Sequence, residues 1–76
     1  MAVKTKPVHE IRIGRIRASI WANKTRDNAI MHDVTVQRLY KADEGWRSTP
    51  SFGRDDLQLV GKVLDRAHTW IFEQAR

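Results

Sequence analysis

The alternation of apolar and polar residues between Ile16 and Ala22 constrains the fold more than any other feature of the sequence. Isoleucine and alanine occupy every second position, and arginine, serine and tryptophan stand between them. A period of two is typical of a β-strand that turns one face to a core and the other to solvent. The alternation extends back to Ile11 and Ile13, and the intervening Gly14 predicts a bulge or bend. Residues 8–23 therefore predict extended structure in a sheet with one open face.

A second alternating stretch covers residues 30–41 and is separated from the first by a polar loop at 24–28. The acidic, glycine-containing segment 42–45 predicts a turn. Residues 46–52 then predict a returning strand, so that the region forms a hairpin. Pro50 has no backbone N–H, and therefore this strand lies at a sheet edge or ends its pairing early.

The last third of the chain predicts one helix, which begins near Asp55 as the N-cap and continues to about Gln74. Its apolar residues cover an arc of roughly 160°, whereas a helix with one packed side needs a stripe of about 100°. The helix could be a deeply cradled core helix, or it could pack on its own sheet and on a partner helix. We favour the second arrangement, a helix-mediated homodimer. The expected interface residues are Val60, Val63, Leu64, Ala67, Trp70 and Ile71.

The size of the chain supports the expectation of a dimer. A chain of 76 residues without cysteine has neither disulfides nor a cysteine-bound zinc to stabilise it, so oligomerisation is the remaining common route. We expect a flexible basic arm at residues 1–7, followed by a single domain at 8–76. There is no secretory signal and no apolar run of about 20 residues, which favours a soluble cytoplasmic protein (nucleoid-associated, or nuclear in a eukaryote) without a membrane partner.

Catalytic chemistry has little support in the sequence. His9, His32 and His68 are scattered without a helical metal-ligand spacing, so we expect no metal. Asp55 and Asp56 are explained by their place at a helix start, and no glycine-rich phosphate loop is present. We therefore expect a non-catalytic protein with no cofactor and no small-molecule substrate.

Positive charge is concentrated in the first two thirds of the chain. The formal net charge is +5, and residues 1–54 hold 11 Lys and Arg against 5 Asp and Glu. Aromatic rings are interleaved with these cations on the predicted strands. Cations neutralise phosphates and flat rings stack on unpaired bases, so the pattern predicts a single-stranded nucleic acid as partner. The candidate contact residues are Arg15, Arg17, Trp21, Lys24, Arg26, Arg38, Tyr40, Lys41, Trp46 and Arg47.

The order of short motifs resembles a known family. The segments Ile13-Gly14-Arg15-Ile16-Arg17, Val34 to Tyr40 and Asp43-Glu44-Gly45, followed by one helix, look like the single-stranded-DNA-binding domain of the transcriptional positive cofactor four family, which is similar in fold to the plant Whirly proteins. The resemblance covers about residues 8–75. It implies an α+β fold with a curved antiparallel sheet of about four strands and a C-terminal helix (ββββα), which dimerises mainly through the helices.

By position, the resemblance implies that Arg15, Arg17 and Tyr40 contact DNA, with Lys24 and Arg26 in a basic loop. The expected function is largely sequence-independent binding of single-stranded DNA by a homodimer, in transcription or DNA maintenance. Two alternatives stay open. The basic face could serve a protein-interaction or assembly module, in which the rings need not stack on an oligonucleotide, or the target could be RNA, which uses the same physics.

Overall fold

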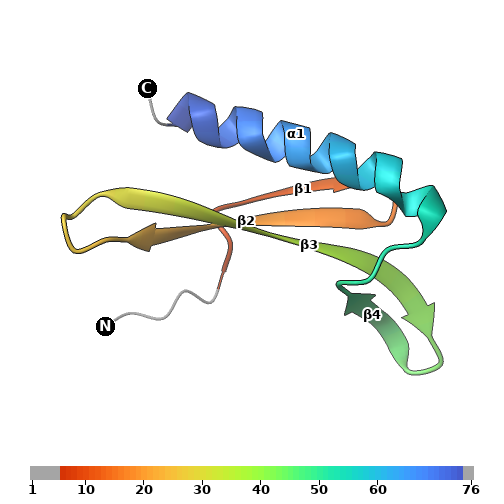
Figure 1. Cartoon of the computed structure of the whole chain (residues 1–76). Coiled ribbons are helices and arrows are strands. Elements are labelled where there is room, and N and C mark those ends of the chain that lie inside the picture. The colour runs from red at the N-terminus through yellow and green to blue at the C-terminus, as the bar shows by residue number, and fades with distance from the viewer. Residues whose placement is uncertain (1–5, 75–76) are drawn as a thin grey trace.

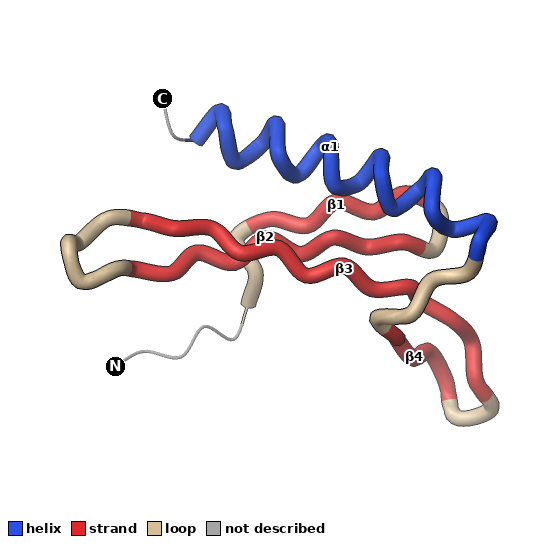
Figure 2. The backbone as a smooth tube through the Cα atoms, in the orientation of Figure 1, coloured by secondary structure: helices blue, strands red, loops and turns tan. Residues whose placement is uncertain are grey.

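The computed structural model describes residues 6–74, which form one antiparallel sheet and one long helix. The elements are β1 (His9–Ile13), β2 (Ile16–Lys24), β3 (Ile30–Ala42), β4 (Gly45–Thr49), a short 3₁₀ turn η1 (Arg54–Asp56) and α1 (Leu57–Gln74). The strands lie side by side in chain order, and α1 covers one face of the sheet (Figures 1 and 2). The ββββα prediction is therefore confirmed. The predicted arm at residues 1–7 falls mostly on residues 1–5, outside the described range.

The first alternating stretch is a hairpin of two strands, and not one strand with a bulge. Gly14 has a φ of 59°, a left-handed conformation that glycine adopts without the clash of a Cβ atom. The chain reverses at Gly14 and Arg15, so that Ile13 pairs directly with Ile16. The prediction of a bulge or bend was wrong because a single glycine between two alternating segments is compatible with both a kink and a complete reversal.

The hairpin predicted at residues 30–52 matches the structure more closely, because β3 and β4 form it. β2 and β3 pair from Ile16↔Arg38 to Lys24↔Ile30, and β3 continues into its pairing with β4. The pairing of β4 ends at Thr49, one residue before Pro50, as a residue without a backbone N–H requires. The returning strand is thus shorter than the predicted 46–52. We call the β3–β4 hairpin at residues 38–49 the arm from here on. It is distinct from the N-terminal arm predicted at residues 1–7.

The core lies between the sheet and α1, at the middle of β2. Ile16, Ala18 and Ile20 have no exposed surface, and neither does Val63 on the helix. These strand residues are every second residue of β2, so all three point to the helix side. Each large aliphatic side chain buried in this way contributes about 1.5–3 kcal/mol to folding.

The helical segment starts where the sequence suggests, because η1 at Arg54–Asp56 runs directly into α1 at Leu57, but the N-cap is Gly53 and not Asp55. Asp56, only 3% exposed, accepts a hydrogen bond from the backbone N–H of Gly53 at 3.0 Å and closes the first turn. Asp55, the predicted N-cap, instead has its side chain in solvent and lies 3.5 Å from Arg54. The helix continues to Gln74, the last described residue, as the sequence predicts.

The helix covers only part of the sheet. α1 packs mainly on β1 and β2, and the arm extends beyond it and bends away (Figure 1). The molecule is elongated, with principal extents of 44 × 26 × 15 Å. Among residues 6–74, no helix has the length and apolar character to cross a bilayer.

Candidate nucleic-acid interface

The sheet has a covered face under α1 and an open face on the opposite side. Alternation along β2 places Arg17, Ser19 and Trp21 on the open face, since Ile16, Ala18 and Ile20 are buried under the helix. The middle of this face is partly covered, because Ser19 is only 5% exposed and Arg17 and Trp21 are half-buried. The register continues through β3 and β4 without a bulge, so the same parity places Lys41 and Trp46 on the open side of the arm.

Arg17 lies at the centre of the open face. Its guanidinium donates to the side-chain oxygen of Gln37 on β3, and its partner on β1 is Arg12. Two arginines directly opposite each other repel, and neither forms an ion pair with any described residue. Arg12 was not among the predicted contact residues. Arg12 lies beside Arg17 because of the register between β1 and β2, and the sequence alone does not determine that register.

The aromatic rings of the open side are held in different ways. Trp21 is half-buried, and its indole N–H donates to Thr35 on the neighbouring strand at 3.0 Å. Trp46 is 68% exposed, and the Lys41 ammonium lies 6.0 Å from its ring centroid. Trp46 therefore offers a flat ring to solvent with a cation beside it, while Trp21 offers one side of an anchored ring. We call Arg12, Arg17, Trp21, Lys41 and Trp46 the basic-aromatic surface.

The other side of the arm carries a second group of predicted residues. Tyr40 and Arg47 face each other across the strands, and the Arg38 guanidinium lies 5.9 Å from the Tyr40 ring centroid. Arg47 forms an ion pair with Glu44 in the arm's turn. Tyr40 and Trp46 thus project to opposite sides of the arm, and one flat platform cannot include both rings.

Two of the predicted phosphate contacts are already paired with a buried carboxylate. Arg15 Nε lies 2.9 Å from one Asp56 oxygen, and Arg38 Nε lies 3.6 Å from the other. Burial raises the pKa of Asp56, but the Gly53 N–H, Arg15 and Arg38 outweigh burial and hold this pKa below its ordinary value of 3.8. Arg15 was expected on one row with Arg17. It lies instead in the β1–β2 turn, where it joins the helix start to the sheet.

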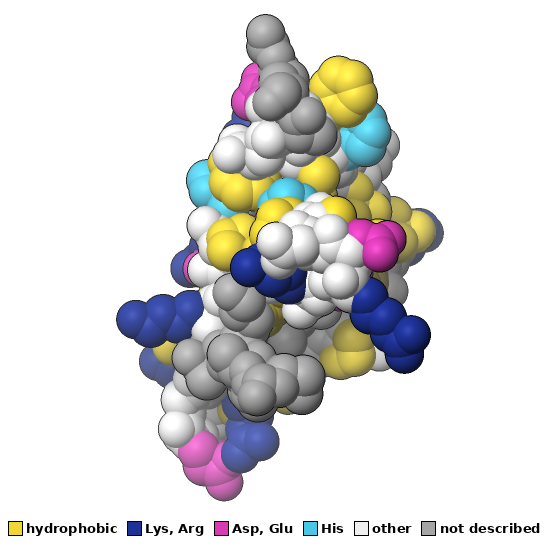
Figure 3. All heavy atoms as spheres, turned by 90° about the vertical axis from the view of Figure 1, so that its left-hand side faces the viewer, with side chains coloured by type: hydrophobic (Ala, Val, Ile, Leu, Met, Phe, Trp, Pro, Cys, Tyr) yellow, Lys and Arg dark blue, Asp and Glu magenta, His cyan; other side chains and the backbone are white. Residues whose placement is uncertain are grey.

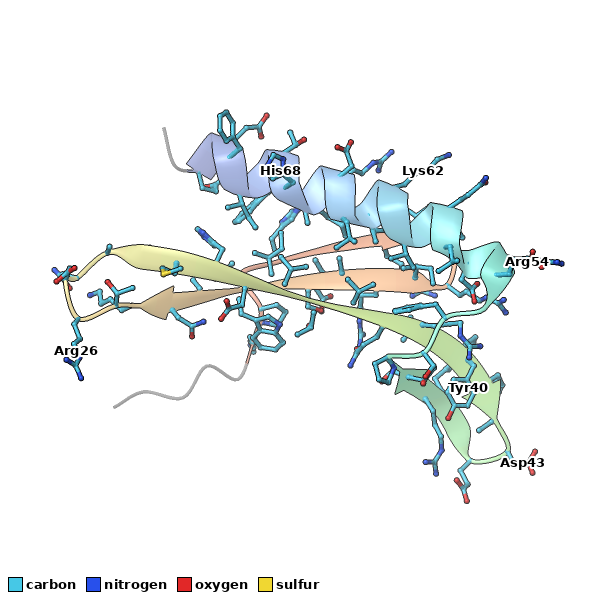
Figure 4. The ribbon with its side chains drawn as sticks, viewed as in Figure 1. Arg26, Tyr40, Asp43, Arg54, Lys62 and His68 are labelled. Atoms are coloured by element: carbon cyan, nitrogen blue, oxygen red, sulfur yellow. The ribbon has the colours of Figure 1, made fainter. Side chains whose placement is uncertain are left out.

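Lys24 and Arg26 are far from the other candidates. They lie at the end of β2 and in the β2–β3 turn, and Figure 4 shows Arg26 at the opposite end of the molecule from Tyr40. The structure therefore brings together the cations and rings of the central sheet and the arm. The β2–β3 turn lies away from them.

The predicted dimer residues divide into two groups. Val63 and Ala67 are fully buried by the protomer's own sheet, and Trp70 stacks on His9 with ring centroids 4.7 Å apart. Val63 and Ala67 therefore belong to the core under the sheet, and Trp70 is half-buried against His9 on the groove side of the helix. The helix side beside this core carries three exposed apolar side chains and two half-buried ones. We call these five residues the apolar flank: Leu57, Leu64 and Phe72, which are exposed, with Val60 and Ile71, which are half-buried.

The apolar flank is unusual for an exposed surface. Leu64 is 43% exposed and Phe72 is 68% exposed, although both are large apolar side chains. Viewed from the β2–β3 turn, hydrophobic side chains reach the surface around the helix, whereas Lys and Arg extend from the lower half of the molecule (Figure 3). Leu57 and Phe72 belong to this flank, although neither was among the predicted dimer residues. The helical spacing of 57, 60, 64 and 71 could have separated this side from the core side.

No three histidine or acidic side chains converge to form a metal site within residues 6–74. Comparison with known proteins adds no relative: no protein-family model, curated protein or solved structure matches the chain.

Proposed function

We propose that this protein is a homodimer that binds single-stranded DNA on the basic-aromatic surface without catalysing a reaction. The observation that carries the proposal is Trp46, an indole that is 68% exposed on a projecting two-stranded arm with the Lys41 ammonium beside it. Exposing a ring of this size to water costs free energy, and a ligand that covers the ring removes this cost. An unpaired base covers the ring by stacking, and its phosphate meets the lysine.

The type of nucleic acid follows from the shape of the surface. The bases of a duplex are stacked on one another, so their faces are not available to Trp46 or Trp21, whereas the bases of a single strand are. Arg12 and Arg17 supply positive charge between the two rings, and neither is neutralised by a described carboxylate. Contacts to ring faces and phosphates carry little sequence information, so binding is largely independent of sequence.

The apolar flank supports the homodimer. Four of its five residues, at positions 57, 60, 64 and 71, follow one another at intervals of three, four and seven along α1, the spacing by which two helices pack along one seam. A second copy of the same flank provides a complementary apolar surface and removes both from water. The dimer then carries two basic-aromatic surfaces, which raises the affinity for a strand long enough to reach both.

Direct binding tests the proposal. Fluorescence anisotropy of a labelled strand of about 20 nucleotides is compared with its duplex and its RNA counterpart at two salt concentrations. We expect the single-stranded DNA to bind more tightly than the duplex, and the affinity to fall as salt rises. Absence of binding to all three at low salt would contradict the proposal and favour an acidic protein partner.

Substitution of Trp46 and Lys41 separates stacking from charge. We expect Trp46→Ala to weaken single-strand binding roughly 5- to 150-fold, because one stacked base contributes about 1–3 kcal/mol. The dependence of affinity on salt should stay unchanged in this variant. Lys41→Gln should instead lower the slope of log affinity against log salt by about 0.7, the value for one phosphate contact of a single strand. Trp46→Phe is the matched control, since it keeps an aromatic ring. Equal losses in the alanine and phenylalanine variants would exclude stacking as the reason.

A further inference from the structure

A groove runs along the free edge of the sheet, on the side of α1 away from the apolar flank. It has a volume of about 490 Å³ and lies between β1 and the second half of the helix. Residues 9–12 form its strand side, and Arg66, Thr69, Trp70 and Glu73 form its helix side. β1 pairs only with β2, so its outer edge is open among the described residues. The apolar flank contributes no residue to this edge or to the groove above it, and of the basic-aromatic surface only Arg12 belongs to them.

The β1–β2 turn determines which backbone groups point outward from this edge. Ile13 and Ile16 close a two-residue turn, so they are a hydrogen-bonded pair of the antiparallel ladder. Hydrogen-bonded and non-bonded positions alternate along such a ladder. Glu10 and Arg12 therefore direct their N–H and C=O groups away from β2, toward the open side of the edge.

The sequence of this edge is complementary to itself. If two copies of β1 pair antiparallel about a two-fold axis at Ile11, Glu10 of each copy lies opposite Arg12 of the other. These are the same two residues whose backbone groups point outward. The register that pairs their charges therefore also lets their N–H and C=O groups form hydrogen bonds with the second copy. Opposite charges facing each other across antiparallel strands stabilise the pair, whereas like charges destabilise it.

The helix layer fits the same two-fold axis. Arg66 and Glu73 lie on the groove side of α1 with Thr69 and Trp70 between them, and Trp70 stacks on His9 at the start of β1. With strands about 4.8 Å apart and α1 over β1 and β2, the two helices would be about 10 Å apart. Packed helices lie 8–10 Å apart, so neither a clash nor a gap results.

We propose that the β1 edge binds the β1 edge of a second copy of this chain, which joins two sheets into one continuous sheet. The pairing would be independent of the apolar flank, because the two surfaces lie on opposite sides of α1. Short charged edge strands often serve to prevent edge pairing. Charges of one sign would prevent such pairing, because they repel the same charges on a second copy. Glu10 and Arg12 have opposite signs, so each instead attracts the other residue on a second copy.

Charge reversal tests the pairing, with self-association measured by sedimentation equilibrium in the Leu64→Glu background, so that the apolar flank does not contribute. Arg12→Glu places two glutamates opposite each other, and Glu10→Arg places two arginines opposite each other. We expect each single reversal to weaken edge association roughly tenfold or more. The double variant Glu10→Arg with Arg12→Glu restores opposite charges at every pair, and we expect it to associate as the parent does.

Rescue by the double variant is the decisive result, because only a pairing of residue 10 with residue 12 predicts it. A parent that stays monomeric at millimolar concentration, or a double variant no better than the singles, would overturn the proposal. Both side chains lie at the surface, so we expect each variant to fold. Circular dichroism verifies the folding of each variant. If Leu64→Glu does not fold, the same series in the unaltered chain measures association beyond the flank dimer. None of these measurements requires nucleic acid, so the result is independent of the proposed function.

Discussion

Asp56→Asn is expected to lower the melting temperature by several degrees at neutral pH, although the substitution keeps the shape of the side chain. Asp56 is 3% exposed and lies between Arg15 and Arg38, with its second oxygen also accepting from the Gly53 N–H. An asparagine leaves two guanidinium groups close together without the carboxylate that compensates both. Because these contacts join the β1–β2 turn, β3 and the start of α1, their loss loosens the attachment of the helix to the sheet.

The pH dependence of stability provides a second readout of the same site. The folded state holds the pKa of Asp56 below its ordinary value of 3.8, so the folded protein binds this proton less readily than the unfolded chain. The stabilising contribution is therefore complete above the unfolded pKa, and it is lost as the pH falls below 3.8 and through the folded pKa. We expect the melting temperature of the unaltered protein to fall as the pH is lowered through this range. In Asp56→Asn, the part of this fall that protonation of Asp56 causes should be absent.

Asp55→Asn is the matched control for this prediction. Asp55 is the neighbouring residue of the same type, but its side chain is 87% exposed and its contact with Arg54 lies in solvent. Surface ion pairs of this kind contribute little to stability, so we expect an unchanged melting temperature. Equal effects of the two substitutions would show that the acidic first turn in general, and not the buried contact with two arginines, stabilises the helix start.

The contrast between Asp55 and Asp56 also shows what the sequence could predict. Two adjacent acids before an apolar helix predict a helix start at the correct place. Which of the two lies inside depends on where Arg15 and Arg38 meet the chain, and these arginines are 41 and 18 positions away. No local pattern carries that information. For the same reason, the sequence indicated Arg15 and Arg38 as free cations for phosphate, whereas the fold pairs both.

Alternation predicted the sheet better than it predicted the site. The period of two in β2 correctly separated Ile16, Ala18 and Ile20 from Arg17 and Trp21, because burial on one face selects the pattern directly. The position of Arg12 beside Arg17, and of Tyr40 and Trp46 on opposite sides of the arm, depends on register between strands. Register follows from the turns at Gly14 and Gly45, whose types a single sequence leaves open.

The helix illustrates a third limit. Its wide apolar arc correctly indicated more hydrophobic surface than one sheet can cover, but it did not divide the arc into a core side and an exposed side. The sheet makes that division by burying Val63, Ala67 and most of Trp70, and by leaving Leu57, Leu64 and Phe72 in solvent. A substitution at Leu64 therefore has a different expected result from one at Trp70, although both residues belong to the predicted interface.

Leu64→Glu is expected to produce a folded monomer. Leu64 lies at the middle of the apolar flank and is 43% exposed in the protomer, so the fold can accept a charge there. In a helix-mediated dimer the same position is buried against the second copy, and the glutamate would meet its own counterpart or an apolar side chain. Central interface residues of this kind contribute about 2 kcal/mol or more, so we expect flank dimerisation to weaken at least roughly 30-fold. Sedimentation equilibrium measures the mass, and circular dichroism measures the fold.

Two comparisons separate an interface effect from a loss of folding. Gln58→Glu adds the same charge to an exposed position on the other side of α1 and should leave the dimer intact. Trp70→Ala removes the ring that lies between His9 and His32, a loss of about 3–5 kcal/mol in a core. A domain of this length is stabilised by only about 4–11 kcal/mol, so Trp70→Ala should unfold the protein over much of the accessible temperature range. A Leu64→Glu protein that remains a dimer would place the interface elsewhere, and the exposed leucines and phenylalanine of α1 would then need another partner.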